Sequence, residues 1–322
     1  MPSSRKPWLS LLLATLCQVC LAQPYPAKPV RLIVPAQPGG GLDLVGRTMA
    51  DQLGKALEQT FVVENVSGGG GSIATQTVAR AAPDGYTLMI GYVTTHATNP
   101  AVRKVPYDPV KDFTAVAMVG GTANMLVVHP SVPVADLKGF VEYARTQAGK
   151  LKYASGGIGT LNHLIFEQLK GEAGFDAVIA HYRGIGPAFQ NLVSGHVDAL
   201  TPGVAAALPH IRRKSAKPIA VTGTARHPLL PDVPTFAEAG FKGYDAVQWY
   251  GIVGPAKMPR DVTQRLNAEV GKALSSPALK QRFTAEAIDP MPMSPEQFGA
   301  FIQAELVRYS NLARERKIQL DD

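Results

Sequence analysis

Cysteine is almost missing from this chain. Of its 322 residues only Cys17 and Cys20 are cysteine, and both lie near the N-terminus. If that segment is removed on export, no thiol remains, which excludes disulfides, cysteine-ligated metals and cysteine nucleophiles. Long apolar runs are missing too, because no later segment approaches the ~18 uninterrupted apolar residues that a transmembrane helix needs.

The N-terminal residues have the three-part layout of a secretory signal peptide. The basic residues Arg5 and Lys6 precede an apolar run at 8–16, and a short segment then ends at Ala22. We therefore expect residues 1–22 to be a signal peptide and the mature protein to be located in the periplasm.

Charge of one sign does not dominate. The whole chain has 32 basic and 25 acidic residues, which gives a formal charge of +7. Removal of Arg5 and Lys6 with the signal peptide lowers this charge to +5. The basic residues are dispersed, and the dense cluster at 212–214 fits a solvated helix end better than a nucleic-acid surface. We expect no nucleic-acid partner, whereas mild basicity suits an anionic ligand.

Signatures of enzymes and metal sites are missing as well. The seven histidines include no H-E-x-x-H or other close metal-ligand spacing. No G-x-S-x-G elbow supplies a hydrolase nucleophile, and the carboxylates do not cluster as acid and base partners. We therefore expect no metal, no cofactor and no catalytic residue.

One short motif suggests a nucleotide. Gly69, Gly71 and Ala74 fit the pattern G-x-G-x-x-A between a predicted strand and a predicted helix. A dinucleotide site would also need an acidic residue after the next strand, but residues 86–90 run into Gly91 and Tyr92. We interpret residues 67–72 as a flexible turn.

Short apolar segments alternate with helical patterns along the chain, which is typical of helix-covered parallel sheets. The predicted strands are 30–34, 61–64, 86–90, 125–128, 152–154, 177–179 and 219–222. The predicted helices begin at 42, 73, 134, 161 and 187, and residues 262–274, 277–286 and 295–315 are helical. About 300 mature residues exceed one core, so we expect two lobes, with the last helices packing back onto the first lobe.

Two of the strand-to-helix turns share one physical device. Residues 38–43 (PGGGLD) and 155–160 (SGGIGT) each place glycines directly before a predicted helix. A helix start has backbone N–H groups without internal partners and a positive dipole end, and glycines let an anion approach them. Alternatively, the glycines serve only backbone geometry, Thr160 caps its helix, and Asp43 pairs with Arg47 within the helix.

Several motifs in a fixed order resemble one family over essentially the whole mature chain. They are VRLIVPAQPGGGLD, APDGYTLMIG, THATNP, VPYDPVKDF, YASGGIGTLNH, LPHI, LPDVPTFAEAG and WYGIVGPAKMP. With them the chain resembles the extracytoplasmic solute receptors of tripartite tricarboxylate transporters, also called the Bug family.

The resemblance implies an α/β type II periplasmic-binding-protein fold, with two α/β lobes, a ligand cleft and hinge crossovers near 120–125 and 244–249. We expect residues 23–122 and 246–322 to form lobe 1 and residues 123–245 to form lobe 2. The implied function is a periplasmic solute-binding receptor that captures a small carboxylate, such as an organic acid, a di- or tricarboxylate or an aromatic carboxylate. Its implied partners are the integral-membrane permease subunits, and we expect a monomer.

The resemblance also carries ligand-binding residues onto this chain. The first loop offers Gln37, Gly39, Gly40, Leu42 and Asp43, the middle segment Thr94, Thr95 and His96, the second loop Ser155, Gly159, Thr160 and His163, and Tyr182 and Arg183 also line the implied cleft.

Two positions qualify this assignment. Trp249 fits the cleft and equally fits hinge or core packing. Pro202-Gly203 stands where many members have Asp-Asn, which argues against an amino-acid ligand whose ammonium group needs an acidic partner. Two other function classes remain open, a periplasmic sensor subunit and a periplasmic enzyme on the same fold.

Overall fold

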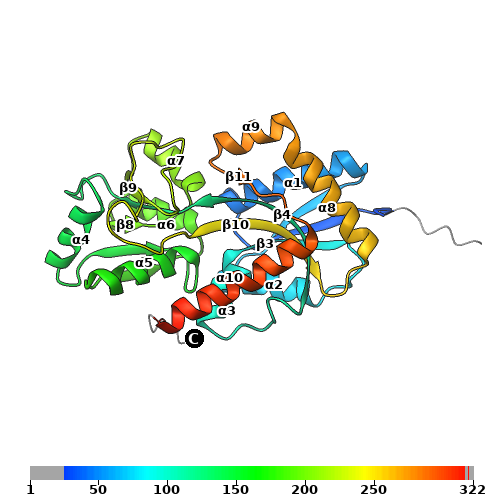
Figure 1. Ribbon diagram of the computed structural model, residues 1–322, viewed down its shortest axis with the longest axis horizontal. Coiled ribbons are helices and arrows are strands. Elements are labelled where there is room, and N and C mark those ends of the chain that lie inside the picture. Colours follow the sequence, from blue (N-terminus) through cyan, green and yellow to red (C-terminus); the bar gives the residue numbers. More distant parts are fainter. Residues whose placement is uncertain (1–24, 316–317, 319–322) are drawn as a thin grey trace, which may run out of the picture.

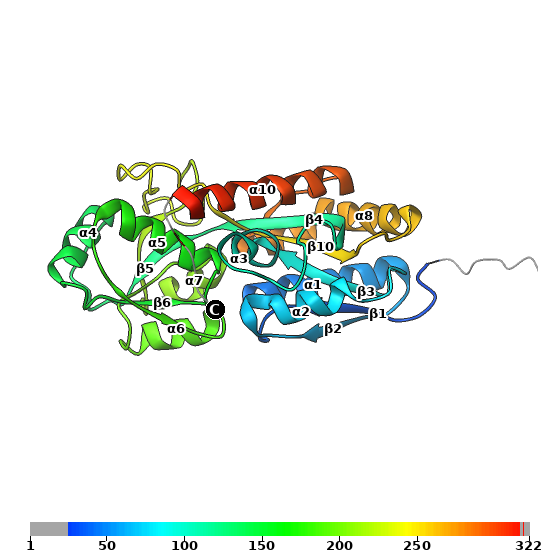
Figure 2. The same ribbon diagram turned by 90° about the horizontal axis from the view of Figure 1, so that it is seen from below.

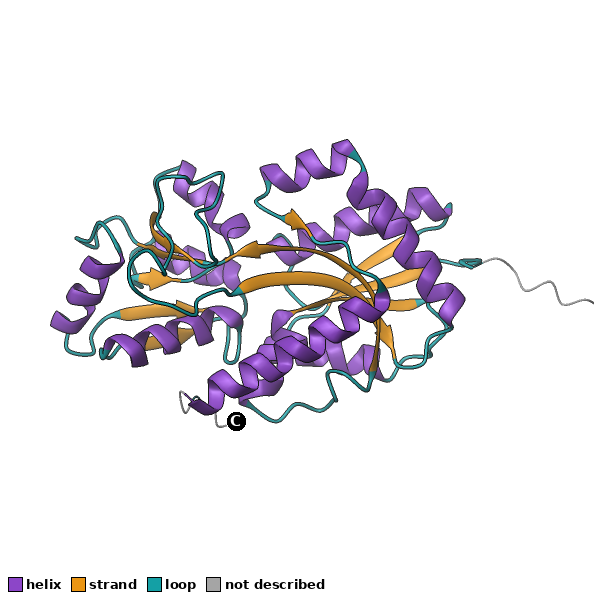
Figure 3. Ribbon diagram, viewed as in Figure 1, coloured by secondary structure: helices purple, strands orange, loops and turns teal. Residues whose placement is uncertain are grey.

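The structure is a computed structural model that describes residues 25–315 and residue 318 (Figure 1). The expected signal peptide lies outside the described residues. The described chain forms two sheets, each covered by helices, and two long strands run between them (Figure 3). No helix in this part of the chain combines the length and apolarity needed to cross a membrane.

The first sheet has six strands in the order β11-β4-β10-β3-β1-β2. Its central members β1 and β3 are almost fully buried apolar strands, as their Val, Ile and Leu content predicts. Strand β1 pairs in parallel with β2 and β3, whereas β10 is antiparallel to both β3 and β4. The strands are β1 (Val30–Val34), β2 (Phe61–Asn65), β3 (Thr87–Tyr92), β4 (Phe113–Ala123), β10 (Val247–Pro255) and β11 (Asp289–Pro290).

Helices cover both faces of this sheet and form the first lobe with it. Helix α1 buries the predicted apolar stripe from Leu42 to Leu57 against the sheet and against Val262, Leu266 and Val270 of α8. The helical elements are α1 (Gly41–Leu57), η1 (Gly69–Gly71), α2 (Ser72–Ala79), η2 (Thr94–Thr98), α3 (Asn99–Val102), α8 (Arg260–Ser275), α9 (Pro277–Ala285) and α10 (Pro295–Glu315).

The second sheet has five strands in the order β7-β6-β8-β5-β9 and forms the second lobe. Its strands are β5 (Met125–Val128), β6 (Lys152–Ser155), β7 (Val178–His181), β8 (Ala199–Leu200) and β9 (Lys217–Val221). Its helices are α4 (Leu137–Thr146), α5 (Leu161–Ala173), α6 (Ile185–Val193) and α7 (Val204–Arg212). Helix α4 starts three residues later than predicted, because Asp136 caps it by accepting a hydrogen bond from the Gly139 amide at 2.8 Å.

The lobes are joined where β4 passes into β5 and where the chain enters β10. Asn124 alone separates β4 from β5, and its amide donates to the Thr222 hydroxyl at 2.8 Å. That hydroxyl in turn donates to the Ala246 carbonyl at 2.7 Å, so both crossings are tied together. Figure 2 shows α10 lying across the junction, and its Tyr309 and Ala313 share one apolar core with Ile165 of α5.

Candidate functional site

The first glycine loop leaves the start of α1 open. Gly40 precedes α1 in an extended conformation, and no side chain caps the helix. Gly39 has a φ of +88°, which favours glycine, and a Cβ on Gly39 or Gly40 would meet no atom within 4 Å. Gln37, Gly39 and Gly40 are exposed, so the unpaired amides at this end can be reached from outside.

Asp43 holds the shape of this loop. Its carboxylate accepts hydrogen bonds from the Gly39 amide, the Arg47 Nε and the Asn65 Nδ2, each at 2.9 Å. Burial alone would raise the pKa of Asp43, but these hydrogen bonds together outweigh it and hold the pKa below its ordinary value. The intrahelical pair with Arg47 is therefore one part of a larger arrangement that includes the loop.

The side chain of Leu42 is buried in the core of the first lobe. Only its backbone can therefore take part in binding at the start of α1. Gln37 donates from Nε2 to the Ser67 hydroxyl at 2.7 Å, which ties the first loop to the neighbouring turn at 67–72.

The second glycine loop likewise leads to an uncapped helix start. The Ser155 hydroxyl donates to the Gly157 carbonyl at 2.9 Å, and the Gly157 amide donates back to it at 3.0 Å. The Thr160 hydroxyl also donates to the Gly157 carbonyl, at 2.7 Å, and makes no capping bond to α5. The alternative in which Thr160 caps its helix is wrong, because its hydroxyl serves the loop instead.

Two histidines stand beside the second loop. His163 Nδ1 accepts from the Gly159 amide at 3.3 Å, and its ring lies 4.8 Å from that of His181. The Ser155 hydroxyl also lies 3.0 Å from His181 Nδ1. Burial, followed by the neighbouring His163, lowers the pKa of His181. His163, in the first turn of α5, thus orients the Gly159 amide of the preceding loop.

The middle segment is enclosed in the first lobe. Thr94, Thr95 and His96 lie in η2, a single turn of π-helix, and each is at most 1% exposed. The Thr95 hydroxyl lies 2.9 Å from His96 Nδ1, and the His96 ring packs edge-on against Phe113. Burial lowers the pKa of His96 to about 3, so the ring is neutral at physiological pH. These side chains therefore lie in the interior of the first lobe.

The last residues of η2 reach the second loop. The Thr98 hydroxyl donates to the Gly159 carbonyl at 2.7 Å, and Thr98 belongs to the first lobe whereas Gly159 belongs to the second. The middle segment and the second loop were both predicted to lie at the site, and the structure brings them into contact here.

The turn at 67–72, predicted to be flexible, is contacted by side chains from the following elements. Residues 69–71 form the 3-10 turn η1, and the Gly69 carbonyl accepts hydrogen bonds from Asn99 Nδ2, at 3.2 Å, and from Arg103. A Cβ on Gly70 would lie 3.5 Å from the Ile158 carbonyl. This turn therefore fills the space between the first and second glycine loops.

Two tyrosines that the sequence analysis did not select lie opposite each other on the neighbouring strands β3 and β10. Tyr92 and Tyr250 are paired in the register of β3 and β10. The Tyr92 hydroxyl lies 3.4 Å from the Gly70 carbonyl, and the Tyr250 hydroxyl lies 3.7 Å from where a Cβ on Gly41 would be. Burial raises the pKa of both phenols, which keeps them neutral. The available sequence signal was a tyrosine next to glycine in an apolar strand, at Gly91-Tyr92 and Tyr250-Gly251.

In the second lobe the β7–α6 loop lies beside the second glycine loop. The Tyr182 amide donates to the Ser155 carbonyl at 2.9 Å, and Arg183 is exposed. Trp249 is fully buried and packs on Phe298 and Phe301 of the α10 side, which agrees with its core alternative.

Pro202-Gly203 leads into α7, another helix without a side-chain cap. The Ala205 amide donates to the Thr122 hydroxyl at 3.4 Å, so this helix start touches the end of β4. Nearby, Asn124 Oδ1 and Asn162 Nδ2 are buried and have no hydrogen-bond partner among the described residues. Both amides were missed by the sequence analysis, since neither the single asparagine between β4 and β5 nor one in the first turn of α5 gives a distinctive signal.

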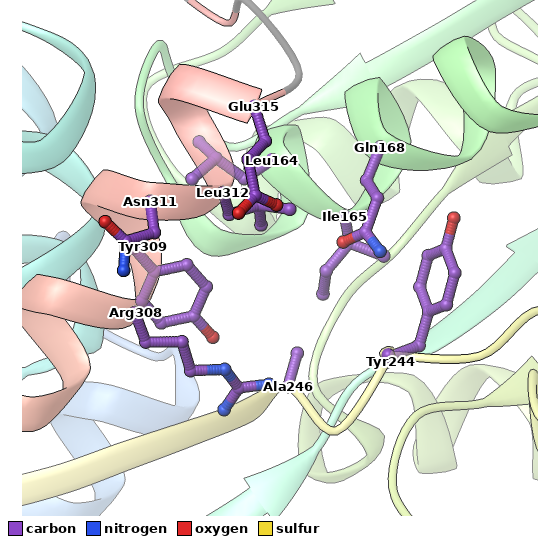
Figure 4. A pocket seen from close by; sticks show the side chains of 11 residues that line it. Leu164, Ile165, Gln168, Tyr244, Ala246, Arg308, Tyr309, Asn311, Leu312 and Glu315 are labelled. Atoms are coloured by element: carbon purple, nitrogen blue, oxygen red, sulfur yellow. The ribbon is translucent and has the colours of Figure 1, made fainter.

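A separate cavity of about 280 Å³ lies on the side of α10 (Figure 4). Residues of α5, α10 and the crossing before β10 line it, among them Gln168, Tyr309 and Ala246. None of the predicted ligand residues is among its lining residues. Among residues 25–315 and 318, no three histidine, aspartate or glutamate side chains are grouped so that they could hold a metal ion.

Solved structures with the same architecture define the class of protein. A periplasmic transporter structure has a TM-score of 0.89 at 36% identity, and it covers 92% of this chain and 100% of its own. The R. palustris protein Rpa4515, solved with adipate, has a TM-score of 0.89 at 33% identity, covering 92% and 99%. MatC of Rhodopseudomonas palustris, solved with malate, has a TM-score of 0.86 at 32% identity, covering 89% and 99%. The predicted two-lobed α/β fold of the type II periplasmic-binding class is thus confirmed.

The sequence relatives are equally extensive. Protein BugT of Bordetella pertussis is 31% identical over 301 residues, covering 93% of this chain and 92% of its own. A protein encoded between tcbD and tcbE in Pseudomonas sp. strain P51 is 33% identical over 295 residues, covering 91% and 88%. Residues 45–318 match the family described as tripartite tricarboxylate transporter family receptor. The chain belongs to this receptor family, which confirms the resemblance found in the sequence.

Proposed function

We propose that this protein is a periplasmic receptor that holds a small carboxylate between the starts of α1 and α5 and delivers it to the membrane permease of a tripartite tricarboxylate transporter. One observation carries the proposal: two uncapped, glycine-lined helix starts belong to opposite lobes, and the turn at 67–72 lies beside both of their loops. The adipate and malate bound to the similar receptors support this ligand class.

The binding residues of this proposal are those selected from the sequence, with different roles. The backbone amides at Gly40, at Leu42 and at the first residues of α5 bind the anion, while Asp43, Ser155 and His163 hold the two loops in shape. Thr160 also holds the second loop, because its amide donates to the Gly157 carbonyl at 3.3 Å. Tyr182 and Arg183 form the rim on the second lobe. Asn162 adds an amide donor, because its buried Nδ2 has no partner among the described residues.

The energetics of such a site are adequate without a charged partner for the ligand. Hydrogen bonds to a charged group contribute ~1.5 to 3 kcal/mol each. Three or four of them support a dissociation constant of the order of micromolar, about −8 kcal/mol, after the costs of ordering. Uncharged backbone donors therefore suffice.

The lobe boundaries and the cellular setting are part of the same proposal. The lobes divide between residues 122 and 123 and between 245 and 246, next to the hydrogen bonds of Thr222. Residues 1–22 direct export to the periplasm, the protein acts as a monomer, and it binds its ligand without converting it. Membership of a receptor family supports binding without catalysis.

A ligand screen with a matched pair of variants tests the proposal. The purified mature protein is screened by thermal shift against adipate, malate, citrate and benzoate, and the best ligand is measured by calorimetry. Gly40→Val places its side chain in open space before α1, so we expect affinity to fall more than about tenfold with little change in melting temperature.

The control is Gly171→Val, the same substitution at an exposed site in α5 where a Cβ also meets nothing within 4 Å. It should bind as the wild type does. Equal affinity in Gly40→Val and wild type, or no stabilisation by any carboxylate, would overturn the proposal.

A further inference from the structure

Thr98 and Gly159 form a buried hydrogen bond between the two lobes. The Thr98 side chain is fully buried, and its hydroxyl donates to the Gly159 carbonyl at 2.7 Å. Thr98 closes η2 in the first lobe, whereas Gly159 belongs to the loop that opens α5 in the second. A backbone carbonyl in a ligand loop thus takes its partner from the opposite lobe.

Side chains of the first lobe leave no room for a side chain at position 159. Gly159 has a φ of +74°, and a Cβ there would collide with Asn99 Oδ1 and lie 3.2 Å from Val102 Cγ2, both in the first lobe. Asn99 is itself fixed, because its Nδ2 donates to the Gly69 carbonyl at 3.2 Å and to the Ser72 hydroxyl at 3.1 Å. Glycine at 159 is therefore required by the neighbouring lobe as well as by the turn.

The hydrogen bond also determines how the chain enters α5. The Gly159 carbonyl and the Thr160 N–H belong to one planar peptide, so fixing the carbonyl fixes the direction of that amide. The following residue begins α5, whose first amides have no partner within the helix. The Thr160 N–H donates to the Gly157 carbonyl at 3.3 Å, so the bond from Thr98 holds the same peptide from its other side and helps to set the direction in which the chain enters α5.

We propose that Thr98 is a positioning residue that gives the second loop its anion-binding shape only when the lobes are together. This inference rests on the proposed function, because it assigns the second loop to the ligand. Thr98 touches the loop carbonyl and acts on the ligand through it. In a molecule whose lobes are apart, only the first loop would keep its binding shape. The apparent affinity for the ligand therefore depends on the fraction of molecules in which the lobes are together.

Thr98→Val tests the hydroxyl while conserving the shape of the side chain. We expect affinity to fall about three- to tenfold, as for one lost buried hydrogen bond. The change should lie mainly in a faster dissociation rate, measured by stopped flow. Small-angle scattering of the ligand-free protein should give a larger radius of gyration, because the closed form has lost a bond between the lobes.

Thr98→Ser is the rescue variant, since it restores the hydroxyl without the methyl group. It should return affinity and ligand-free radius of gyration to near the wild-type values. If Thr98→Val bound and closed as the wild type does, or if Thr98→Ser were as impaired as Thr98→Val, the proposal would be overturned.

A second set of variants tests the contact from the other side. Gly159→Ala should open the ligand-free protein and reduce affinity more than about tenfold, because the added methyl group meets Asn99. Combining it with Asn99→Ala should recover part of the closure. Gly157→Ala is the matched control: its φ of +135° is also unfavourable for alanine, but the Cβ would face Tyr182 and Thr160 of its own lobe. It should leave the ligand-free radius of gyration unchanged, and opening as large as that of Gly159→Ala would contradict the role of the contact.

These measurements separate the two proposals. If no carboxylate binds the wild-type protein, the proposed function fails. The scattering comparison of Thr98→Val, Thr98→Ser and wild type still decides whether the hydroxyl holds the lobes together.

Discussion

The Trp249 indole N–H donates a hydrogen bond to the Glu305 carboxylate at 3.2 Å, in a part of the core where Trp249 is fully buried and Glu305 is 7% exposed. The bond joins β10, which runs from the junction into the first lobe, to α10, which lies across the junction (Figure 2). Burial raises the pKa of Glu305 despite the opposing effects of Arg308 and of the indole. The connection between the lobes thus contains a carboxyl group whose pKa is raised by burial.

The first prediction concerns the pH dependence of stability at Glu305. A carboxyl whose pKa is raised by folding contributes its full stability below the unfolded value of 4.5 and loses it as the pH rises through the folded pKa. Glu305→Gln keeps an acceptor for the indole and removes the charge. Urea unfolding between about pH 4.5 and 7 should therefore show the wild type losing stability relative to Glu305→Gln as the pH rises.

The exposed Glu142 of α4 provides the control for this measurement. Glu142→Gln should differ from the wild type by a nearly constant amount over the same range. A constant difference for Glu305→Gln as well would show that folding does not raise this pKa.

The second prediction uses two acid–base pairs with the same spacing in α1. Asp43 pairs with Arg47 and also accepts from Gly39 and Asn65, whereas Asp51 pairs with Lys55 at the surface. Asp43→Ala leaves three donors without their acceptor, so we expect a loss of about 1–3 kcal/mol in the free energy of unfolding and weaker carboxylate binding. Asp51→Ala should cost about 0.5 kcal/mol or less and leave binding unchanged.

The same Asp43 network has a defined dependence on acid. Because the folded pKa lies below the unfolded value of 3.8, the stabilisation is present above that value and is lost as the pH falls through the folded pKa. Unfolding and calorimetry on both variants check the prediction. Equal losses from Asp43→Ala and Asp51→Ala would contradict the special role of the first loop.

The third prediction concerns His96. Its pKa falls from 6.5 to about 3 on burial, so the unfolded chain binds a proton that the folded protein excludes. Stability is then complete above pH 6.5 and decreases as the pH falls toward 3, by up to about 1.4 kcal/mol per pH unit. His96→Asn, whose amide can still bond to the Thr95 hydroxyl, should have a shallower loss between pH 6.5 and 4.5.

The exposed His196 supplies the comparison for this slope. His196→Asn should follow the wild-type curve. If His96→Asn followed it too, the ring would have to be protonated in the folded protein.

The sequence predicted the local elements well and the contacts between them poorly, for a physical reason. The spacing of Leu42, Val45 and Met49 records which face of a helix is buried, and that information is local. The hydrogen bond from Thr98 to Gly159 joins residues 61 positions apart, and no local pattern records it. The glycines at 69–71 suggested flexibility because the side chains that hold them, Asn99 and Arg103, come from a later helix.

Burial is a second property that the polar residues of the middle segment do not record. Thr94, Thr95 and His96 form a polar run that predicts contact with a ligand, and η2 buries all three. Thr95 bonds to the Tyr92 backbone, whereas His96 Nε2 has no partner among the described residues. The two glycine loops were predicted correctly as helix starts, since glycine before an apolar helix is a local signal.

The fourth prediction concerns Tyr309, which lines the cavity beside α10 (Figure 4). Tyr309 is 2% exposed, and its hydroxyl has no hydrogen-bond partner among the described residues. A buried polar group without a partner costs free energy, so Tyr309→Phe should leave the stability unchanged or raise it by up to about 1 kcal/mol. Tyr153→Phe is the matched substitution, because the Tyr153 hydroxyl donates to the Asn162 carbonyl at 2.6 Å and its loss should cost about 1–2 kcal/mol. Urea unfolding of the two variants gives the comparison. A loss in Tyr309→Phe as large as that in Tyr153→Phe would mean that the Tyr309 hydroxyl is bonded in solution, and that the cavity supplies the partner.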